Sequence, residues 1–225
     1  IKCGNSLIGW DYFEGQLLPN EDEVARVNPF DWEKAFPEVF TSGAKGGFDA
    51  VISNPPYVRI QSLHSDDISY FSKNYVSTIG NYDIYCPFLE KAIELLNNFG
   101  LTSYIMPHRF FKTNYGYGLR KFLSHNKFVK KIVDFDGFMV FNDASINTCI
   151  TVVSKKQKEE FKYAQIHFIK QPENLMAEIL SNIDHTKARS DKEITIGNLS
   201  SSSLDDSPWI FIHEWEQVLW NKLLK

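Results

Sequence analysis

The sequence has little that would suit a membrane, secreted or metal-binding protein. No apolar stretch approaches the roughly 20 residues of a membrane-spanning helix, and no basic region followed by a long apolar run opens the chain. Only 3 of the 225 residues are cysteines, and they lie far apart, which excludes a disulfide framework and a paired-cysteine zinc site. The six histidines form no metal-binding pair with a carboxylate, and no phosphate-binding Gly-x-x-x-x-Gly-Lys loop occurs. We therefore expect reduced thiols, a cytoplasmic location and no bound metal.

The charged residues are unevenly distributed, although the net charge is only −4. Residues 11–40 contain eight acidic and two basic side chains, whereas residues 109–131 contain seven Lys or Arg and no acid. Such a separation lets a nearly neutral chain present a positive face to a polyanion. The alternative is that the two segments are unrelated solvated surfaces.

Apolar periodicity predicts alternating strands and helices over the first 155 residues. Strands are expected over Phe48–Ser53, Leu101–Met106, Val129–Phe135 and Thr148–Ser154, and helices over Phe88–Asn98 and Gly116–Ser124. Gly100 is expected to end the first helix in a left-handed conformation. This order is typical of an α/β fold, in which helices cover a mainly parallel sheet and the last strand is antiparallel.

After Lys155 the pattern is weaker. It predicts a strand over Tyr163–Lys170, a short helix over Glu173–Ile183 and a strand over Glu193–Ile196. Four consecutive serines, Ser200–Ser203, have the composition of a linker.

The most informative residues follow the first predicted strand and read Asn54-Pro55-Pro56-Tyr57. Ligands of open α/β sheets bind beyond the carboxyl ends of the strands. The Asn54 side-chain oxygen and the Pro55 carbonyl oxygen present two acceptors to one planar NH₂ group, and they favour the pyramidal nitrogen of a transition state. Tyr57 offers an aromatic face for stacking. The alternative is a proline-stiffened turn that ends a strand.

These residues lie within a series of motifs that resembles a known family. Residues 47–59 resemble the fourth motif of amino-methyltransferases that use S-adenosylmethionine, and residues 1–9 and 83–92 resemble the preceding and following motifs. Residues 100–111 and 140–153 continue the series. The set is similar to the gamma-type N6-adenine DNA methyltransferases, particularly those of single-chain type IIG restriction-modification enzymes.

The resemblance implies a partial Rossmann-like methyltransferase sheet, mostly parallel with one antiparallel strand, followed by a small α+β linker region. It places the C-terminal half of the methyltransferase domain at 1–155, a connecting α+β segment at 156–199, and a linker with the start of a target-recognition domain at 200–225.

The resemblance also implies a role for individual residues in methyl transfer to adenine N6 of a flipped base. Asn54 and Pro55 would accept hydrogen bonds from N6, while Tyr57 and Phe141 would stack on the two faces of the base. The alternative for Phe141 is an edge residue of a β-hairpin.

The cofactor site is implied in the same way. Asn5 and Ser6 match positions that contact the adenine of S-adenosylmethionine, although family members often carry Asp and Phe there. Pro56 and Phe88 match apolar walls of that pocket, and the alternative for Phe88 is an ordinary core residue. In the basic segment, Arg109, Lys112 and Arg120 are the expected contacts to the backbone of double-stranded DNA.

Two parts of the family pattern are missing from the sequence: the glycine-rich loop that holds the methionine part of the cofactor, and the acid that binds its ribose. The chain also starts at Ile1, in what reads as the middle of a strand, so we expect an internal segment of a longer protein. We predict that this segment alone is inactive and binds the cofactor weakly. An unpaired edge at the strand before Asn54 predicts self-association.

Two other functions remain open at this point. One is a methyltransferase that acts on RNA or on protein glutamine, because Asn-Pro-Pro-Tyr also serves those amino groups. The other is a non-catalytic DNA-binding or assembly module that has kept the fold.

Overall fold

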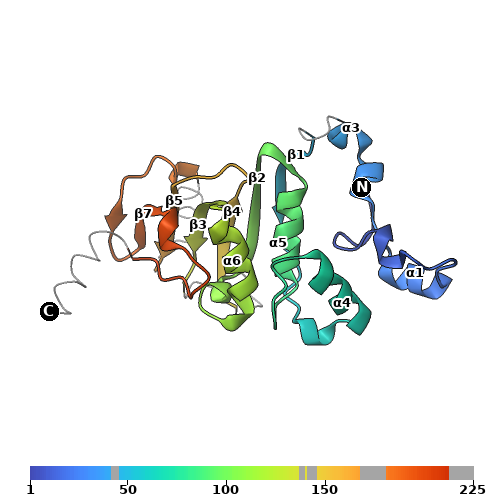
Figure 1. Ribbon diagram of the computed structural model, residues 1–225. Coiled ribbons are helices and arrows are strands. Elements are labelled where there is room, and N and C mark those ends of the chain that lie inside the picture. The colour runs from blue at the N-terminus through green and yellow to red at the C-terminus, as the bar shows by residue number, and fades with distance from the viewer. Residues whose placement is uncertain (42–45, 137–139, 141–145, 168–180, 213–225) are drawn as a thin grey trace.

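One sheet organises the chain. The computed structural model describes residues 1–41, 46–136, 140, 146–167 and 181–212. In this part of the chain seven strands form a sheet in the order β1-β2-β4-β3-β5-β7-β6 (Figure 1). The strands are β1 Phe48–Ser53, β2 Leu96–Pro107, β3 Val129–Asp134, β4 Thr148–Val153, β5 Glu160–Ile166, β6 Arg189–Ser190 and β7 Ile194–Ser200.

The strand directions agree with the sequence prediction. β1 is parallel to β2, and β4 is antiparallel to both of its neighbours, β2 and β3. Within residues 1–155, β1, β2 and β3 therefore run in one direction and β4 is reversed, which confirms the expected mainly parallel sheet with one antiparallel strand. β5 is parallel to β3, and β7 and β6 follow as an antiparallel pair.

Helices pack on this sheet and on the N-terminal segment. The α-helices are α1 Glu21–Val27, α2 Trp32–Ala35, α3 Pro37–Phe40, α4 Ser65–Asn74, α5 Tyr85–Glu94 and α6 Tyr117–His125. Short 3₁₀ helices are η1 Trp10–Phe13, η3 Ile60–Ser62, η4 His108–Phe111, η5 Asn114–Gly116 and η6 Ser201–Ser203. Among the described residues, no helix is both long and apolar enough to cross a membrane.

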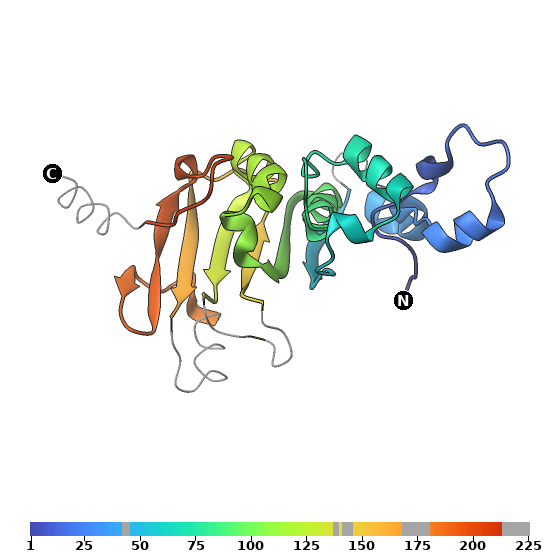
Figure 2. The same cartoon turned by 90° about the horizontal axis from the view of Figure 1, so that it is seen from below.

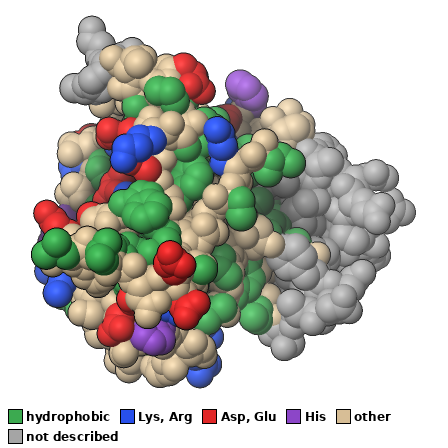
Figure 3. All heavy atoms as spheres, turned by 90° about the vertical axis from the view of Figure 1, so that its right-hand side faces the viewer, with side chains coloured by type: hydrophobic (Ala, Val, Ile, Leu, Met, Phe, Trp, Pro, Cys, Tyr) green, Lys and Arg blue, Asp and Glu red, His purple; other side chains and the backbone are tan. Residues whose placement is uncertain are grey.

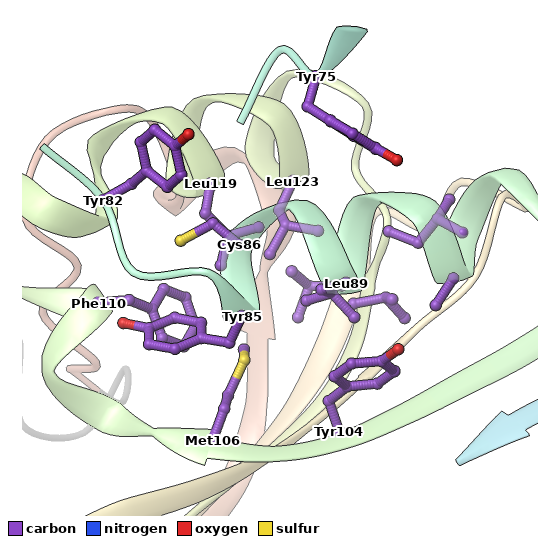
Figure 4. Close-up of a cluster of buried hydrophobic side chains, with 14 of the residues drawn as sticks. Tyr75, Tyr82, Tyr85, Cys86, Leu89, Tyr104, Met106, Phe110, Leu119 and Leu123 are labelled. Carbon is purple, nitrogen blue, oxygen red and sulfur yellow. The ribbon is translucent and has the colours of Figure 1, made fainter. Parts of the chain in front are cut away.

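The main hydrophobic core lies where α5 and α6 cover one face of the sheet (Figure 2). Cys86 and Leu89 of α5 meet Leu119 and Leu123 of α6, and Met106 of β2 closes the cluster from the sheet (Figure 4). All five side chains are 0% exposed. Burying each apolar side chain contributes about 1.5–3 kcal/mol, so this cluster fixes both helices on the sheet.

The end of α5 differs from the sequence prediction. The helix expected over Phe88–Asn98 ends at Glu94, and β2 begins at Leu96, whose side chain is fully buried. Gly100 therefore lies inside β2 and does not end a helix. A Cβ atom at Gly100 would lie 2.6 Å from the carbonyl oxygen of Phe48. The glycine allows a close approach of β1 and β2, and burial of Leu96 in the sheet overrides the helical periodicity.

The segment before β1 also differs from the prediction. Ile1 is exposed and belongs to no strand, and Asn5 forms only an isolated bridge with Pro29. The segment that follows is held against α4, where Arg26 pairs with Asp67 at 2.9 Å and the Tyr70 hydroxyl donates to Asp11 at 2.8 Å. Figure 3 views this side of the molecule, on which hydrophobic side chains lie exposed among acidic and basic ones.

Residues beyond 155 extend the same sheet. β5 pairs with β3, and the chain after β7 returns to the core, where Trp209 is 2% exposed. The Trp209 backbone N–H donates to the Phe111 carbonyl oxygen at 2.7 Å, and the Phe211 ring stacks on Tyr163 with centroids 4.1 Å apart. The expected helix over 173–183 lies mostly outside the described residues. The domain boundaries at 155 and 199 stay a prediction.

Candidate functional site

The Asn-Pro-Pro-Tyr loop leaves the sheet at the carboxyl end of β1, as predicted. Two consecutive prolines end the strand because neither has a backbone N–H to donate to the ladder. Asn54 and Pro56 are exposed, whereas Pro55 is buried and Tyr57 is half-buried. Within the described part of the chain the Asn54 side chain makes no hydrogen bond. Its amide oxygen is therefore available to a ligand at the edge of the sheet.

Tyr57 is held in place by the neighbouring strand. Its hydroxyl donates to the Ile105 carbonyl oxygen of β2 at 3.2 Å, and its ring meets Tyr85 edge to face with centroids 6.5 Å apart. Burial raises the pKa of Tyr57 to about 12. The hydroxyl is therefore neutral near pH 7 and remains a donor, and the exposed part of the ring is left for stacking.

The chain after Tyr57 is joined to the segment that leads into α5. The Ile84 N–H donates to the Val58 carbonyl oxygen at 2.9 Å, and the Ile60 N–H donates to the Tyr82 carbonyl oxygen at 3.2 Å. Arg59 and Asp83 thus face each other in an antiparallel bridge. This pairing brings two segments of the motif series together, although 24 residues separate Arg59 from Asp83 in the chain.

Of the residues predicted to bind the cofactor, Ser6 borders an open cavity of about 640 Å³. Trp32, Tyr70, Lys91 and Glu94 also line this cavity. Sequence reasoning missed these four because nothing in their spacing marks them, and they come from three separate helices, α2, α4 and α5. The cavity therefore combines aromatic surfaces with one basic side chain, Lys91, and four acidic ones, Asp11, Asp31, Glu33 and Glu94.

The other three cofactor predictions lie outside this cavity. The Asn5 side-chain oxygen accepts the Leu7 N–H at 3.1 Å, which holds the local turn. Pro56 is exposed, and Phe88 is half-buried on α5 while its carbonyl oxygen accepts the Tyr104 hydroxyl at 3.2 Å. The roles of Pro56 and Phe88 as apolar walls for an adenine ring stay predictions. Phe141 lies outside the described residues, so its stacking role stays a prediction.

The three predicted DNA contacts have different surroundings. Lys112 is exposed, as a phosphate contact requires. Arg109 is half-buried and is engaged by a buried acid, since its Nη2 lies 2.6 Å from the Asp83 carboxylate. Arg120 is 2% exposed and donates to the carbonyl oxygens of Phe110 and Thr113 at 2.6 and 2.7 Å. The expectation that Arg120 contacts DNA is therefore wrong, because its guanidinium group satisfies carbonyl groups within the fold.

Other basic side chains of residues 109–131 are also paired. Lys127 contacts Glu159 at 2.7 Å, and Lys131 contacts Asp184 at 2.8 Å. The excess of positive charge in this segment is thus partly neutralised by acids from later parts of the chain. The surface is less basic than the sequence of the segment alone indicates.

A further polar cluster at the carboxyl edge was not predicted. His108, just after β2, lies 2.9 Å from Asp134 at the end of β3, and Asp134 also accepts the Tyr163 hydroxyl at 3.3 Å. The two Asp134 carboxylate oxygens thus contact His108 of η4, Tyr163 of β5 and the Asp136 N–H, which donates at 3.0 Å. Nothing in the sequence spacing indicated that these strand ends meet.

The described residues contain no cluster of three or more His, Cys, Asp or Glu side chains that could hold a metal ion. Cys3, Cys86 and Cys149 are free thiols, and the last two are buried. Burial raises the pKa of Cys86 and of Cys149 above the usual range of a thiol. These two cysteines are neutral core residues and not nucleophiles.

Solved structures share this arrangement of sheet and helices. A methyltransferase subunit of a type I restriction-modification system from Streptococcus thermophilus matches 80% of this chain and 37% of its own, with a TM-score of 0.51 and 18% identity. The type IIG restriction endonuclease BpuSI matches 68% of this chain and 19% of its own, with a TM-score of 0.53 and 19% identity. The chain therefore shares the fold of these two structures over the parts that match.

Sequence comparison identifies a specific family, whereas the solved structures show only a shared fold. Residues 4–141 match the family described as Eco57I restriction-modification methylase, and the chain belongs to this family. A type II restriction enzyme and methyltransferase from Escherichia coli, RM.Eco57I, is 28% identical over 97% of this chain and 19% of its own length. The type II methyltransferase M.BstVI from Geobacillus stearothermophilus is 32% identical over 72% of this chain and 30% of its own length. The chain thus spans less than a third of these relatives.

Proposed function

We propose that this chain forms the catalytic part of a DNA methyltransferase of a restriction-modification system, one that methylates adenine N6 in double-stranded DNA and takes the methyl group from S-adenosylmethionine. The observation that carries the proposal is the position of Asn54-Pro55-Pro56-Tyr57 at the carboxyl end of β1, with Tyr57 fixed by Ile105. Family membership and the related DNA-modifying enzymes support it.

In this proposal Asn54 and Pro55 act on the amino group. An amino group conjugated to a purine is a weak nucleophile because its lone pair is delocalised into the ring. The Asn54 amide oxygen and the Pro55 carbonyl oxygen would each accept a hydrogen bond from the N6 amino group. These two bonds would stabilise the pyramidal nitrogen that forms as the methyl group is transferred. Since the prolines fix the backbone, the acceptors need little reorganisation.

Tyr57 would hold the target base against its exposed ring. A base must leave the duplex to reach such a site, because N6 is otherwise paired and stacked. The Ile105 and Tyr85 contacts fix the Tyr57 ring before the base arrives. Phe141 is the proposed partner on the other face of the base.

The proposed methyl donor is S-adenosylmethionine, whose sulfonium supplies an activated methyl group when it is bound. Pro56 and Phe88 would contact its adenine ring as apolar walls, and Ser6 with Asn5 would contact its polar edge. No metal is needed for this reaction. Lys112 is the remaining exposed candidate among the predicted phosphate contacts, and the free thiols support a cytoplasmic location.

The test is methyl transfer by the full-length enzyme that contains this sequence. Incubation with labelled S-adenosylmethionine and separate DNA, RNA and protein acceptors is expected to label DNA, and digestion to nucleosides is expected to yield N6-methyladenine. Label in RNA or in protein glutamine would replace the proposal with that alternative. No transfer to any acceptor would favour a non-catalytic module.

A further inference from the structure

An ion pair joins the segment that is bridged to the chain just after the Asn-Pro-Pro-Tyr loop to the turn after β2. Asp83 is 0% exposed, and its Oδ2 accepts Nε and Nη2 of Arg109 at 3.1 and 2.6 Å. Its other oxygen, Oδ1, has no hydrogen-bond partner among the described residues. The Arg109 side chain is 32% exposed. A buried carboxylate with a single cationic partner depends on that partner, because an unpaired charge is strongly disfavoured away from water.

This ion pair connects the two loops that bound the proposed site. Asp83 is bridged to Arg59, two residues after Tyr57. Arg109 follows the end of β2, four residues after Ile105, which accepts the Tyr57 hydroxyl. The loop after β1, the segment before α5 and the turn after β2 are thereby joined in a closed ring of contacts.

Tyr85 connects these contacts to the aromatic side chain of Tyr57. It lies two residues after Asp83, is fully buried and meets the Tyr57 ring edge to face. A shift of the segment around Asp83 would therefore move both the backbone bridge and the ring that support Tyr57. Arg109 holds that segment because it is the cation that neutralises Asp83.

We infer that Arg109 is a positioning residue, which acts through Asp83 to hold Tyr57 and the loop after β1 in the geometry for methyl transfer, and that it is not a phosphate contact. This inference rests on the proposed function for its catalytic consequence. Its structural consequence, the rigidity of the segments around Tyr57 and Asp83, is independent of the substrate.

The first experiment measures hydrogen exchange in the full-length enzyme. In Arg109→Ala, the amides of Ile60 and Ile84, which bond across the bridge, are expected to exchange faster than in the wild type. Lys112→Ala is the matched control, since it removes an exposed cation from the same turn, and it is expected to leave these amides protected. Unchanged protection in Arg109→Ala contradicts the inference whatever the enzyme methylates.

The second experiment separates positioning from DNA binding. At saturating DNA and cofactor, Arg109→Ala is expected to lower the rate of methyl transfer roughly 10²-fold, the loss typical of a misplaced reacting group. Its DNA affinity and the dependence of that affinity on salt are expected to stay those of the wild type. Lys112→Ala is expected to reduce the salt slope by about 0.9, the value for one phosphate contact.

A conservative variant covers the case in which Arg109→Ala fails to fold. Arg109→Lys keeps the charge and one hydrogen bond to Asp83, so it is expected to fold, to retain the salt slope and to transfer methyl faster than Arg109→Ala but slower than the wild type. An unchanged maximal rate in Arg109→Lys, or a salt slope reduced as in Lys112→Ala, would show that Arg109 binds phosphate or has no role. Lack of N6-methyladenine in the wild type would instead reject the proposed function, and the exchange result would still stand.

Discussion

Glu90 Oε2 accepts the backbone N–H of Ser77 at 2.7 Å, deep beneath the loop that joins α4 to α5. The other carboxylate oxygen accepts the Val76 N–H at 2.9 Å, and Glu90 is only 4% exposed. One acidic side chain therefore satisfies two backbone donors that are partly or fully removed from water. This loop leads directly to Asp83, so Glu90 supports the same region from the side of α5.

Glu90 predicts a specific dependence of stability on pH. Burial raises the pKa of Glu90 above its usual 4.5, so the folded state holds the proton more tightly than the unfolded state does. Its contribution to the free energy of unfolding is therefore complete below pH 4.5 and is lost as the pH rises through the folded pKa. The difference in stability between the wild type and Glu90→Gln is expected to narrow from pH 4 to pH 7 in urea unfolding. A difference that widens with pH would contradict this assignment.

Asn54→Ala is expected to abolish most methyl transfer. The loss of one preorganised group that acts on the transition state is typically about 10²–10³-fold in rate. Since Asn54 is exposed, the melting temperature is expected to stay that of the wild type. The measurement is single-turnover transfer of labelled methyl to DNA. A rate equal to that of the wild type would mean that Asn54 does not contact N6.

Two variants of Tyr57 distinguish the contribution of its aromatic ring to methyl transfer from that of its hydroxyl group. Tyr57→Phe keeps the stacking surface and loses the bond to Ile105, whereas Tyr57→Ala loses both. Stacking of a base on an aromatic ring is worth about 1–3 kcal/mol, so Tyr57→Ala is expected to transfer methyl roughly 5- to 150-fold more slowly than Tyr57→Phe. DNA that carries 2-aminopurine at the target position reports the base outside the stack. Equal fluorescence and equal rates in the two variants would remove the stacking role.

Arg120→Ala is expected to destabilise the fold without changing how DNA binding depends on salt. The substitution leaves the Phe110 carbonyl oxygen without its donor, whereas the Thr113 carbonyl oxygen keeps the Gly116 N–H at 3.1 Å. A buried unsatisfied group costs about 1–3 kcal/mol. Chemical unfolding is expected to show this loss. If the variant instead keeps its stability and binds DNA with a smaller salt slope, the internal role given to Arg120 is wrong.

The 225-residue chain alone is predicted to bind S-adenosylmethionine weakly, because its sequence lacks the glycine-rich loop and the ribose-binding acid of the family pattern. Isothermal calorimetry with the purified chain is the direct measurement. A dissociation constant in the micromolar range would show that the residues around Ser6, Pro56 and Phe88 suffice for the cofactor.

The elements that the sequence predicted well are those whose local pattern agrees with their packing. β1, β3 and β4 lie within one residue of the predicted ranges because short apolar runs bounded by turn residues specify them. The position of Asn54 followed from β1 and the two prolines alone. In these segments tertiary contacts reinforce the local preference.

The contacts that sequence reasoning missed join residues that are distant in the chain. Asp83 and Arg109 are 26 residues apart, and no periodicity marks two side chains that meet only after the sheet has formed. Arg120 lies in a basic helix, and its charge would predict a position on the surface. It is buried instead, because its guanidinium group donates hydrogen bonds to nearby carbonyl oxygens. Buried polar groups form hydrogen bonds with whichever donors or acceptors the tertiary fold brings next to them. The local sequence does not indicate which groups these will be.

The return of Trp209 to the core has a practical consequence for anyone who shortens this protein. The indole lies between 5.7 and 6.1 Å from the rings of Phe110 and Phe111, in the turn that carries Arg109. A cut after residue 155 would uncover the β3 edge and this aromatic contact together, even though it keeps the whole motif series. A deletion series is therefore expected to yield folded protein only when its C-terminal boundary lies beyond Phe211.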